Sequence, residues 1–197
     1  MKKRIMTDRP SVALLESELR RIREAKRRGA VFRRILSAMT LFSMTSLLTL
    51  VFWFPVLQVN GNSMSPALND GDVLLCVKKT DPRQGHIIAF YHNNKLLIKR
   101  VIATAGDTVD IRPDGRVSVN SRVLSEPYIP QLSFGATDIT LPCRIPWDHY
   151  FVLGDSRPAS LDSRSREIGT VPRERILGIA FFRLWPLSRF GPISILA

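Results

Sequence analysis

The sequence predicts an all-β domain of coiled antiparallel β-sheets, preceded by an N-terminal amphipathic segment and one transmembrane helix. After residue 60 the chain consists of short apolar runs separated by Gly, Pro and Asn, which is typical of strands and turns rather than helices. An uncharged apolar stretch precedes this part, and a strongly basic arm precedes the stretch. The 197 residues suffice for one domain of ordinary size plus such an appendage.

Seven apolar runs in the C-terminal part are predicted to be strands. Asn93-Asn94 and Pro113-Asp114-Gly115 are turn signals that predict hairpin connections between neighbouring runs. The segment 123–148 is rich in Pro and polar residues, and we expect it to be a loop-rich excursion. The predicted strands are Val73–Val77, His86–Tyr91, Lys95–Thr104, Thr108–Arg112, Val117–Asn120, Tyr150–Leu153 and Ile176–Trp185.

Residues 35–59 are predicted to be a transmembrane anchor, because this stretch carries no charge and is predominantly apolar. A helix of this length would measure about 37 Å, against a hydrocarbon core of about 30 Å. A cleaved signal peptide is one alternative, but its apolar core would have only about 7–15 residues and would end in a small-x-small site. Pro55–Val59 lacks that pattern. A buried core helix is the other alternative, and it fits poorly because the stretch is apolar on all faces.

The positive charge is concentrated in residues 1–34, which hold 12 Lys or Arg against 4 Asp or Glu, whereas the whole chain has a formal net charge of +12. A basic arm indicates nucleic acid or an anionic membrane surface, and the apolar stretch behind it favours membrane lipid, with no nucleic acid as partner. Apolar residues recur at helical spacing over Ser11–Arg28, which predicts a helix on the cytoplasmic leaflet; a solvated, partly disordered arm is the alternative. The positive-inside rule predicts a single-pass protein of the cell membrane, with residues 1–34 in the cytoplasm and the domain 60–197 outside.

Ser63 and Lys99 could form a nucleophile and its base. Ser63 lies in the turn-like stretch Gly61-Asn62-Ser63-Met64-Ser65-Pro66-Ala67-Leu68, and a serine hydroxyl is a weak nucleophile that needs a base. Lys99 lies in the apolar run Leu97-Ile98-Lys99-Arg100-Val101, where alternation along a strand puts it on the face of Leu97 and Val101. If the pKa of Lys99 had its ordinary value of about 10.4, on the order of one side chain in a thousand would be neutral at neutral pH. Burial on an apolar face would lower the pKa by several units.

Each of these residues also has an ordinary structural interpretation, as a turn serine and as a lysine packed in a strand. The periodicity does not establish that their side chains meet. A histidine-based or metal site is not indicated, because His86, His92 and His149 are scattered and the cysteines are not spaced as ligands. Cys76 and Cys143 could form a disulfide in an oxidising compartment or could be buried apolar residues.

Several stretches resemble the successive motifs of bacterial type I signal peptidases, in the family's order and spacing and behind a membrane anchor. The resemblance covers roughly residues 35–186. It implies a signal-peptidase-type fold and a membrane-bound serine endopeptidase that cleaves signal peptides from exported preproteins without a cofactor. The matching stretches are Gly61–Leu68, Gly71–Val73, Lys99–Val101, Gly106-Asp107, Gly154–Arg157, Ser160–Arg164, Gly169–Pro172, Ile176–Gly178 and Trp185-Pro186.

The resemblance also implies roles for individual residues. Ser63 corresponds to the nucleophile, whose own N–H would bind the oxyanion, and Lys99 corresponds to the general base. Ser160 corresponds to a serine that orients the lysine amine. Asp162 and Arg164 correspond to an ion pair that supports the site; a surface pair of little energetic consequence is the alternative. The residues expected to line substrate pockets for small side chains at the first and third positions before the cut are Leu57, Val59, Gly61, Met64, Leu74 and Ile98.

The chain departs from the family pattern in three places, which leaves its substrate preference open. Residues 102–107 lack the usual internal Gly and Pro. Ser156, Pro158 and Ala159 replace the more usual Asn, Asp and Asn, and Ala67 stands where threonine is frequent.

Three other functions are compatible with parts of the sequence. One is a specialised processing peptidase of the same fold, acting on pilin or conjugation subunits. Another is a self-cleaving Ser-Lys repressor that binds DNA, which the apolar stretch 35–59 argues against. The last is a catalytically inactive membrane adaptor, which intact Ser63 and Lys99 argue against.

Overall fold

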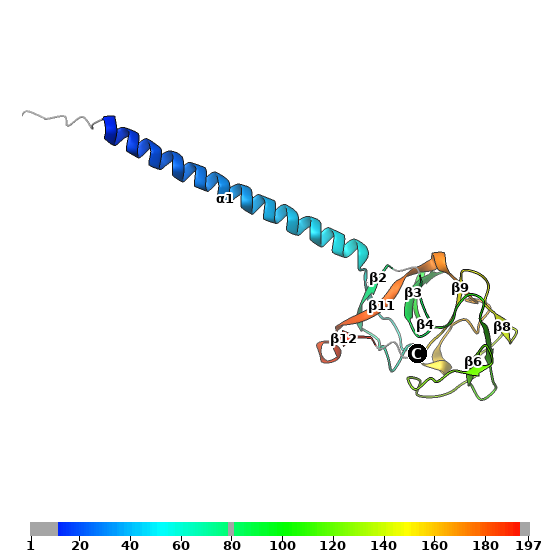
Figure 1. Ribbon diagram of the computed structural model, residues 1–197. Helices are drawn as coiled ribbons and strands as arrows, with labels where there is room; N and C mark the ends of the chain where they lie inside the picture. The colour runs from blue at the N-terminus through cyan, green and yellow to red at the C-terminus, as the bar shows by residue number, and fades with distance from the viewer. Residues whose placement is uncertain (1–11, 79–80, 194–197) are drawn as a thin grey trace, which may run out of the picture. The chain divides into compact units, whose positions relative to one another are not determined.

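The computed structural model describes residues 12–78 and 81–193 (Figure 1). The chain divides into two compact units, residues 1–50 and 51–197. Most of one long helix, α1 (Val12–Trp53), belongs to the first unit. All strands of the described residues belong to the second unit, and this part of the chain has the predicted all-β antiparallel fold.

Helix α1 begins before the predicted anchor and ends before the anchor's predicted end. The segment that could cross a membrane by length and composition is Lys26–Thr49, and its large apolar side chains are exposed. The helix stops at Trp53 and does not reach the predicted boundary at residue 59, because Pro55 lacks the N–H that a helix interior needs. The next residues, Val56–Gln58, form an edge strand, β1.

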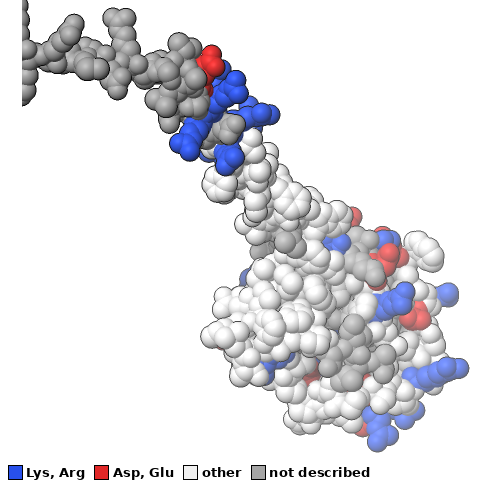
Figure 2. All heavy atoms as spheres, turned by 60° about the vertical axis from the view of Figure 1, so that its left-hand side comes forward, with Lys and Arg blue, Asp and Glu red and all other residues white. Residues whose placement is uncertain are grey.

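Exposed basic side chains gather on α1 before its uninterrupted apolar part (Figure 2). Successive residues of an α-helix are rotated by about 100°, so these positions spread over about two thirds of the circumference of the helix. The exposure of the apolar side chains nearest the start of α1 lies outside what the structure describes, and the amphipathic surface over Ser11–Arg28 stays a prediction. The basic residues are Arg20, Arg21, Arg23, Lys26, Arg27, Arg28, Arg33 and Arg34.

The larger sheet has the strand order β1-β2-β11-β3-β4-β9-β10, with β12 paired to β11, and every pair is antiparallel. The five predicted strands in this sheet are all present, within one residue of their predicted bounds. The other three strands of this sheet have only two or three residues each, too few to show the alternation of apolar and polar residues from which a strand is predicted. The strands are β1, β2 (Val73–Val77), β3 (Ile87–His92), β4 (Lys95–Ala103), β9 (His149–Leu153), β10 (Val171–Pro172), β11 (Ile176–Trp185) and β12 (Gly191–Pro192).

The smaller sheet has the order β7-β6-β5-β8 and adjoins the excursion 123–148. Much of this excursion is irregular, and Leu124, Phe134 and Ile139 pack on a core cluster that includes Ile102 and Phe151. The excursion is therefore attached to the larger sheet. The strands are β5 (Thr108–Ile111), β6 (Val117–Val119), β7 (Arg122–Val123) and β8 (Cys143–Arg144). Three short 3-10 turns are η1 (Arg157–Ala159), η2 (Arg173–Arg175) and η3 (Leu187–Arg189).

The hairpin between β3 and β4 has the predicted turn. Asn93 and Asn94 have positive φ angles of 47° and 59°, as a two-residue type I′ connection requires, and asparagine tolerates that region. This turn fixes the register in which Ile88 lies opposite Lys99.

Apolar clusters cover both faces of the larger sheet around β4. Leu97 and Val101 belong with Ile88 to one cluster, whereas Ile98 packs with Met64 in the other. Strand β4 is therefore buried on both sides where Lys99 lies.

The two cysteines are not paired with each other. Cys76 is buried in β2 as a member of an apolar cluster, and Cys143 lies in β8 beside another. Both thiols are free; a buried apolar role describes Cys76, whereas Cys143 is only half-buried.

Candidate active site

Ser63 lies in a loop that is closed at its neck and anchored in the core. The Val59 N–H donates to the Asp72 carbonyl at 2.8 Å, and the Gly71 N–H donates to the Val59 carbonyl at 2.9 Å. Between these residues, Met64 and Leu68 are buried in the apolar cluster below. The loop thus holds Ser63 partly exposed on a fixed backbone.

Gly61 shapes the start of this loop. Its φ of 88° lies in the left-handed region that favours glycine, and its N–H donates to Asp70 Oδ1 at 2.6 Å. A Cβ built at Gly61 meets no atom within 4 Å, so the glycine serves the backbone conformation and not a close contact.

Lys99 reaches Ser63 from β4. Its Nζ lies 2.6 Å from Ser63 Oγ, within hydrogen-bond distance, and the residue is only 3% exposed. The structure therefore brings together two side chains that lie 36 positions apart in the sequence.

Burial lowers the pKa of the Lys99 amine from its ordinary 10.5 to about 8. The carboxylates of Asp162 and Asp155 raise it again in part, and the guanidinium of Arg164 lowers it. With a pKa of about 8, about one molecule in ten has a neutral amine at pH 7, on the order of a hundredfold more than for an ordinary lysine. A neutral amine is what a base for Ser63 requires.

Gly154 is packed tightly between Ser63 and Ser160. A Cβ at Gly154 would lie 2.5 Å from the Ser63 carbonyl oxygen and 2.2 Å from Ser160 Oγ. The Ser63 carbonyl also accepts from the Ser156 N–H at 3.1 Å. Ser160 Oγ is buried and has no hydrogen-bond partner in the structure, so Ser160 lies at the site without a hydrogen bond to Lys99.

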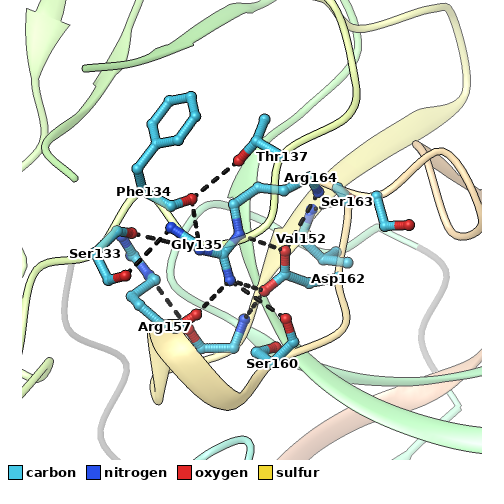
Figure 3. A network of polar contacts seen from close by, with 12 residues as sticks. Ser133, Phe134, Gly135, Thr137, Val152, Arg157, Ser160, Asp162, Ser163 and Arg164 are labelled. Atoms are coloured by element: carbon cyan, nitrogen blue, oxygen red, sulfur yellow. Dashed lines mark hydrogen bonds and ion pairs between the residues drawn. The ribbon is translucent and has the colours of Figure 1, made fainter. Parts of the chain in front are cut away.

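Asp162 and Arg164 form a buried ion pair with two contacts, Nε–Oδ1 at 2.8 Å and Nη2–Oδ2 at 2.9 Å (Figure 3). Asp162 Oδ2 also accepts from the Gly154 N–H at 3.0 Å. The Arg164 guanidinium donates to the carbonyls of Arg157 at 2.7 Å and Phe134 at 3.1 Å. Because both residues are at most 2% exposed, the surface-pair alternative does not describe them.

A cavity of about 100 Å³ lies beside Ser63 and Lys99. It is small against the roughly 300–1,000 Å³ of pockets for drug-sized ligands, and its size suits a small side chain. The residues that line it are Gln58, Val59, Asn60, Ser63, Met64, Leu96, Leu97, Ile98 and Lys99.

Three of the six predicted pocket residues line this cavity: Val59, Met64 and Ile98. Leu74 does not, because alternation in β2 turns it into the apolar core, where Leu57 packs against the same cluster. Gly61 is also not among the lining residues.

The sequence profile described as "Signal peptidase, peptidase S26" matches residues 32–185. The chain belongs to this family. A probable signal peptidase I-2 from Synechocystis sp. is 38% identical over 151 residues, which cover 69% of this chain and 65% of that protein. A signal peptidase I from Bacillus amyloliquefaciens is 34% identical over 148 residues, covering 70% of this chain and 79% of that protein. The crystal structure of a signal peptidase I from Enterococcus faecalis V583 matches at 31% identity with a TM-score of 0.43, covering 50% of this chain and 96% of that chain.

Membership of the signal peptidase family confirms the predicted fold class and the predicted enzyme class, a serine peptidase of the signal peptidase I type. The three alternatives considered from the sequence gain no support from these relatives. The apolar helix α1 agrees with a membrane-anchored enzyme.

A second buried ion pair in this signal peptidase escaped the sequence analysis. Arg100 contacts Asp155 through Nε–Oδ1 at 2.8 Å and Nη2–Oδ2 at 2.7 Å, and both residues are 1% exposed. The Arg100 guanidinium also donates to the Gly85 carbonyl at 2.9 Å. Arg100 and Asp155 lie within the matching stretches Lys99–Val101 and Gly154–Arg157, but no pattern in the sequence indicated that they pair with each other.

The three departures from the family motifs have local explanations. In residues 102–107, the Thr104 N–H donates to Asp107 Oδ2 at 2.9 Å, which closes the turn without a proline. Pro158 and Ala159 lie in the short turn η1, and Ser156, just before this turn, donates its N–H to the Ser63 carbonyl at 3.1 Å. Ala67 contributes its carbonyl, which accepts from Arg183.

Proposed function

We propose that the protein is a membrane-anchored serine endopeptidase that removes signal peptides from exported preproteins, with Ser63 as nucleophile and Lys99 as general base. The observation that carries this proposal is the 2.6 Å distance between Lys99 Nζ and Ser63 Oγ in a site whose burial lowers the lysine pKa to about 8. The names of the relatives, signal peptidase I, support the substrate class.

In the proposed mechanism, Ser63 Oγ attacks the scissile carbonyl carbon while the neutral Lys99 amine takes the hydroxyl proton. The oxyanion that forms would accept a hydrogen bond from the Ser63 N–H. Lys99 then gives its proton to the leaving amine, and an acyl-enzyme on Ser63 remains. Water activated by the same amine hydrolyses this ester and regenerates the serine.

We assign supporting roles to three residues. Asp162 and Arg164 hold the backbone of Gly154, and Ser160 fills the space beside Lys99 and Gly154 as a candidate hydrogen-bond partner of the lysine amine. Val59, Met64 and Ile98 would contact the small side chain before the cut, together with Gln58 and Leu96, which the sequence analysis did not single out.

The proposed topology puts residues 1–34 in the cytoplasm and the catalytic domain outside. The exposed basic side chains of α1 all lie at or before Arg34, on the N-terminal side of the uncharged stretch that begins at Ile35, as the positive-inside rule requires. Membrane lipid with anionic headgroups is the partner proposed for them, and no nucleic acid is involved. Tethering enzyme and substrate to one bilayer raises their effective concentration.

Purified wild-type protein in detergent or vesicles should cleave an exported preprotein at the end of its signal peptide, and Ser63→Ala should abolish cleavage because the nucleophilic oxygen is missing. The measurement is the N-terminal sequence and the rate of formation of the mature product. Ser125→Ala, at an exposed serine of the excursion, is the matched control and should retain normal activity.

Rescue of cells depleted of their general signal peptidase would separate a general enzyme from a dedicated one. Cleavage restricted to a single pilin or conjugation subunit would contradict the general role, and undiminished cleavage by Ser63→Ala would contradict the proposed nucleophile.

The pH dependence of cleavage should follow the Lys99 amine. Lysine is neutral above its pKa, so kcat/KM is expected to rise about tenfold per pH unit below pH 8 and to level off above it. The measurement is the rate on one preprotein between pH 6 and about 10. A rate that falls between pH 7 and 9, or a midpoint at the ordinary lysine value, would contradict a lysine base with a lowered pKa.

A further inference from the structure

The tripeptide Glu126-Pro127-Tyr128 connects the excursion to both members of the dyad. We propose that Glu126 and Tyr128 are positioning residues that hold Ser63 and Lys99 in their reactive arrangement. This inference rests on the proposed function, since it assigns a role within the same site.

Glu126 acts on the side of the nucleophile, through Arg157. The two side chains form an ion pair in which Arg157 is 1% and Glu126 3% exposed. Arg157 Nε donates to the Gly154 carbonyl at 3.2 Å. Gly154 in turn is packed so closely on Ser63 that an added Cβ would lie 2.5 Å from the Ser63 carbonyl oxygen. Three contacts in series therefore connect Glu126 with the nucleophile's backbone.

Tyr128 acts on the side of the base. Its ring centroid lies 4.2 Å from Arg100 Cζ, which is the geometry of a cation–π contact. Arg100 is the neighbour of Lys99 in β4 and is held by Asp155. The Tyr128 hydroxyl donates to Glu126 Oε1 at 2.9 Å. This hydrogen bond links the contacts on the side of Ser63 to those on the side of Lys99.

Glu126 also neutralises a buried positive charge at the site. Three buried arginines lie around Gly154, and two of them are paired with carboxylates of their own neighbourhood, Arg100 with Asp155 and Arg164 with Asp162. Among the described residues, Arg157 has its ion pair with Glu126 alone. An unpaired buried cation is strongly unfavourable, so loss of Glu126 would displace Arg157 and with it the support of Gly154.

The first test is Glu126→Gln, with Glu174→Gln at an exposed glutamate as the matched control. We expect kcat on a preprotein to fall about tenfold and KM to change less than about twofold, because the reacting atoms of the dyad shift while the apolar walls of the cavity at Val59, Met64 and Ile98 stay in place. In a double-mutant cycle, Glu126→Gln should add little to Arg157→Gln, since both break one contact. The control should keep the wild-type kcat.

The second test does not depend on cleavage. In Tyr128→Leu, the Arg100 guanidinium loses the aromatic ring that covers it. We expect water to enter beside Lys99, which weakens the effect of burial, and Arg100 to neutralise Asp155 less. Each of these two changes raises the pKa of Lys99. Titration of the 13C-labelled Lys99 Cε by NMR should show a midpoint raised by about half a pH unit or more above the wild type. Tyr91→Leu, at an exposed tyrosine of β3, should leave the midpoint unchanged.

A role limited to general stability would lower the melting temperature while the folded fraction kept its kcat and its Lys99 midpoint, and that result would overturn the proposal. Additive losses in the double-mutant cycle would also overturn it. If the wild type cleaves no preprotein, the proposed function fails, whereas the Lys99 titration still decides whether Tyr128 positions the base.

Discussion

Lys99→Ala is expected to lower kcat/KM for signal-peptide cleavage by a hundredfold to ten-thousandfold or more, the range for loss of a general base. No other described amine, imidazole or carboxylate makes a hydrogen bond to Ser63 Oγ, so the hydroxyl would keep its proton at neutral pH. The measurement is single-turnover and steady-state cleavage of one preprotein. KM should change little, because Lys99 touches the reacting atoms more than the substrate's apolar contacts.

The variant Lys99→Met tests whether the loss of activity comes from unfolding rather than from loss of the base. Because the folded-state pKa is lowered from 10.5 to about 8, the buried ammonium costs the fold about 3 kcal/mol at pH 7. This cost is fully present below pH 8 and disappears as the pH rises to the unfolded value. Lys99→Met removes it, so the variant should be inactive yet at least as stable as the wild type. Near-normal cleavage by either variant would contradict the dyad.

Gly154→Ala is expected to lower kcat/KM by on the order of a hundredfold, because the new methyl group overlaps backbone that cannot yield cheaply. The Cβ would lie 2.5 Å from the Ser63 carbonyl oxygen and 2.5 Å from Ser160 Cβ, so the nucleophile or the neighbouring loop must shift. The measurement is the same cleavage assay, together with thermal unfolding.

Gly29→Ala is the matched control, since a Cβ there meets nothing within 4 Å and alanine favours a helix more than glycine does. It should leave cleavage unchanged. If Gly154→Ala retained wild-type activity, Gly154 could not be the contact through which the surrounding loops hold Ser63.

The strands of the catalytic domain could be predicted because their alternation and turn residues are local properties of the sequence. Asn93-Asn94 marks its hairpin by itself, and β2 and β11 begin and end as predicted. The end of the helix also had a local signal, Pro55, but the predicted anchor was bounded by its lack of charge and so ran on to residue 59. Residues 54–59 are as uncharged as those before them, and only their pairing with β2 makes Val56–Gln58 a strand.

The site could be predicted only as far as motifs reach. Ser63 and Lys99 each have a recognisable neighbourhood, but their contact arises from the loop neck at Val59 and Asp72 and from the register of β4. Two buried ion pairs connect segments that are distant in the sequence, Arg100 with Asp155 and Arg157 with Glu126. No local sequence pattern indicates which residues form such pairs. Leu74 was predicted to line the pocket because a leucine suits both a pocket and a core, and the structure places it in the core cluster.

The edge strand β1 lies between the end of α1 and the cavity proposed to bind substrate. It follows α1 after two residues, pairs with β2, and leads through Gln58 into the cavity wall at Val59. A soluble protein that begins at residue 60 would therefore lack Gln58 and Val59, which form one wall of the cavity proposed to bind substrate. A soluble enzyme that begins at residue 54 would keep it. In a chimera, any exchanged anchor must be joined before Pro55 if cleavage-site choice is to stay that of this protein.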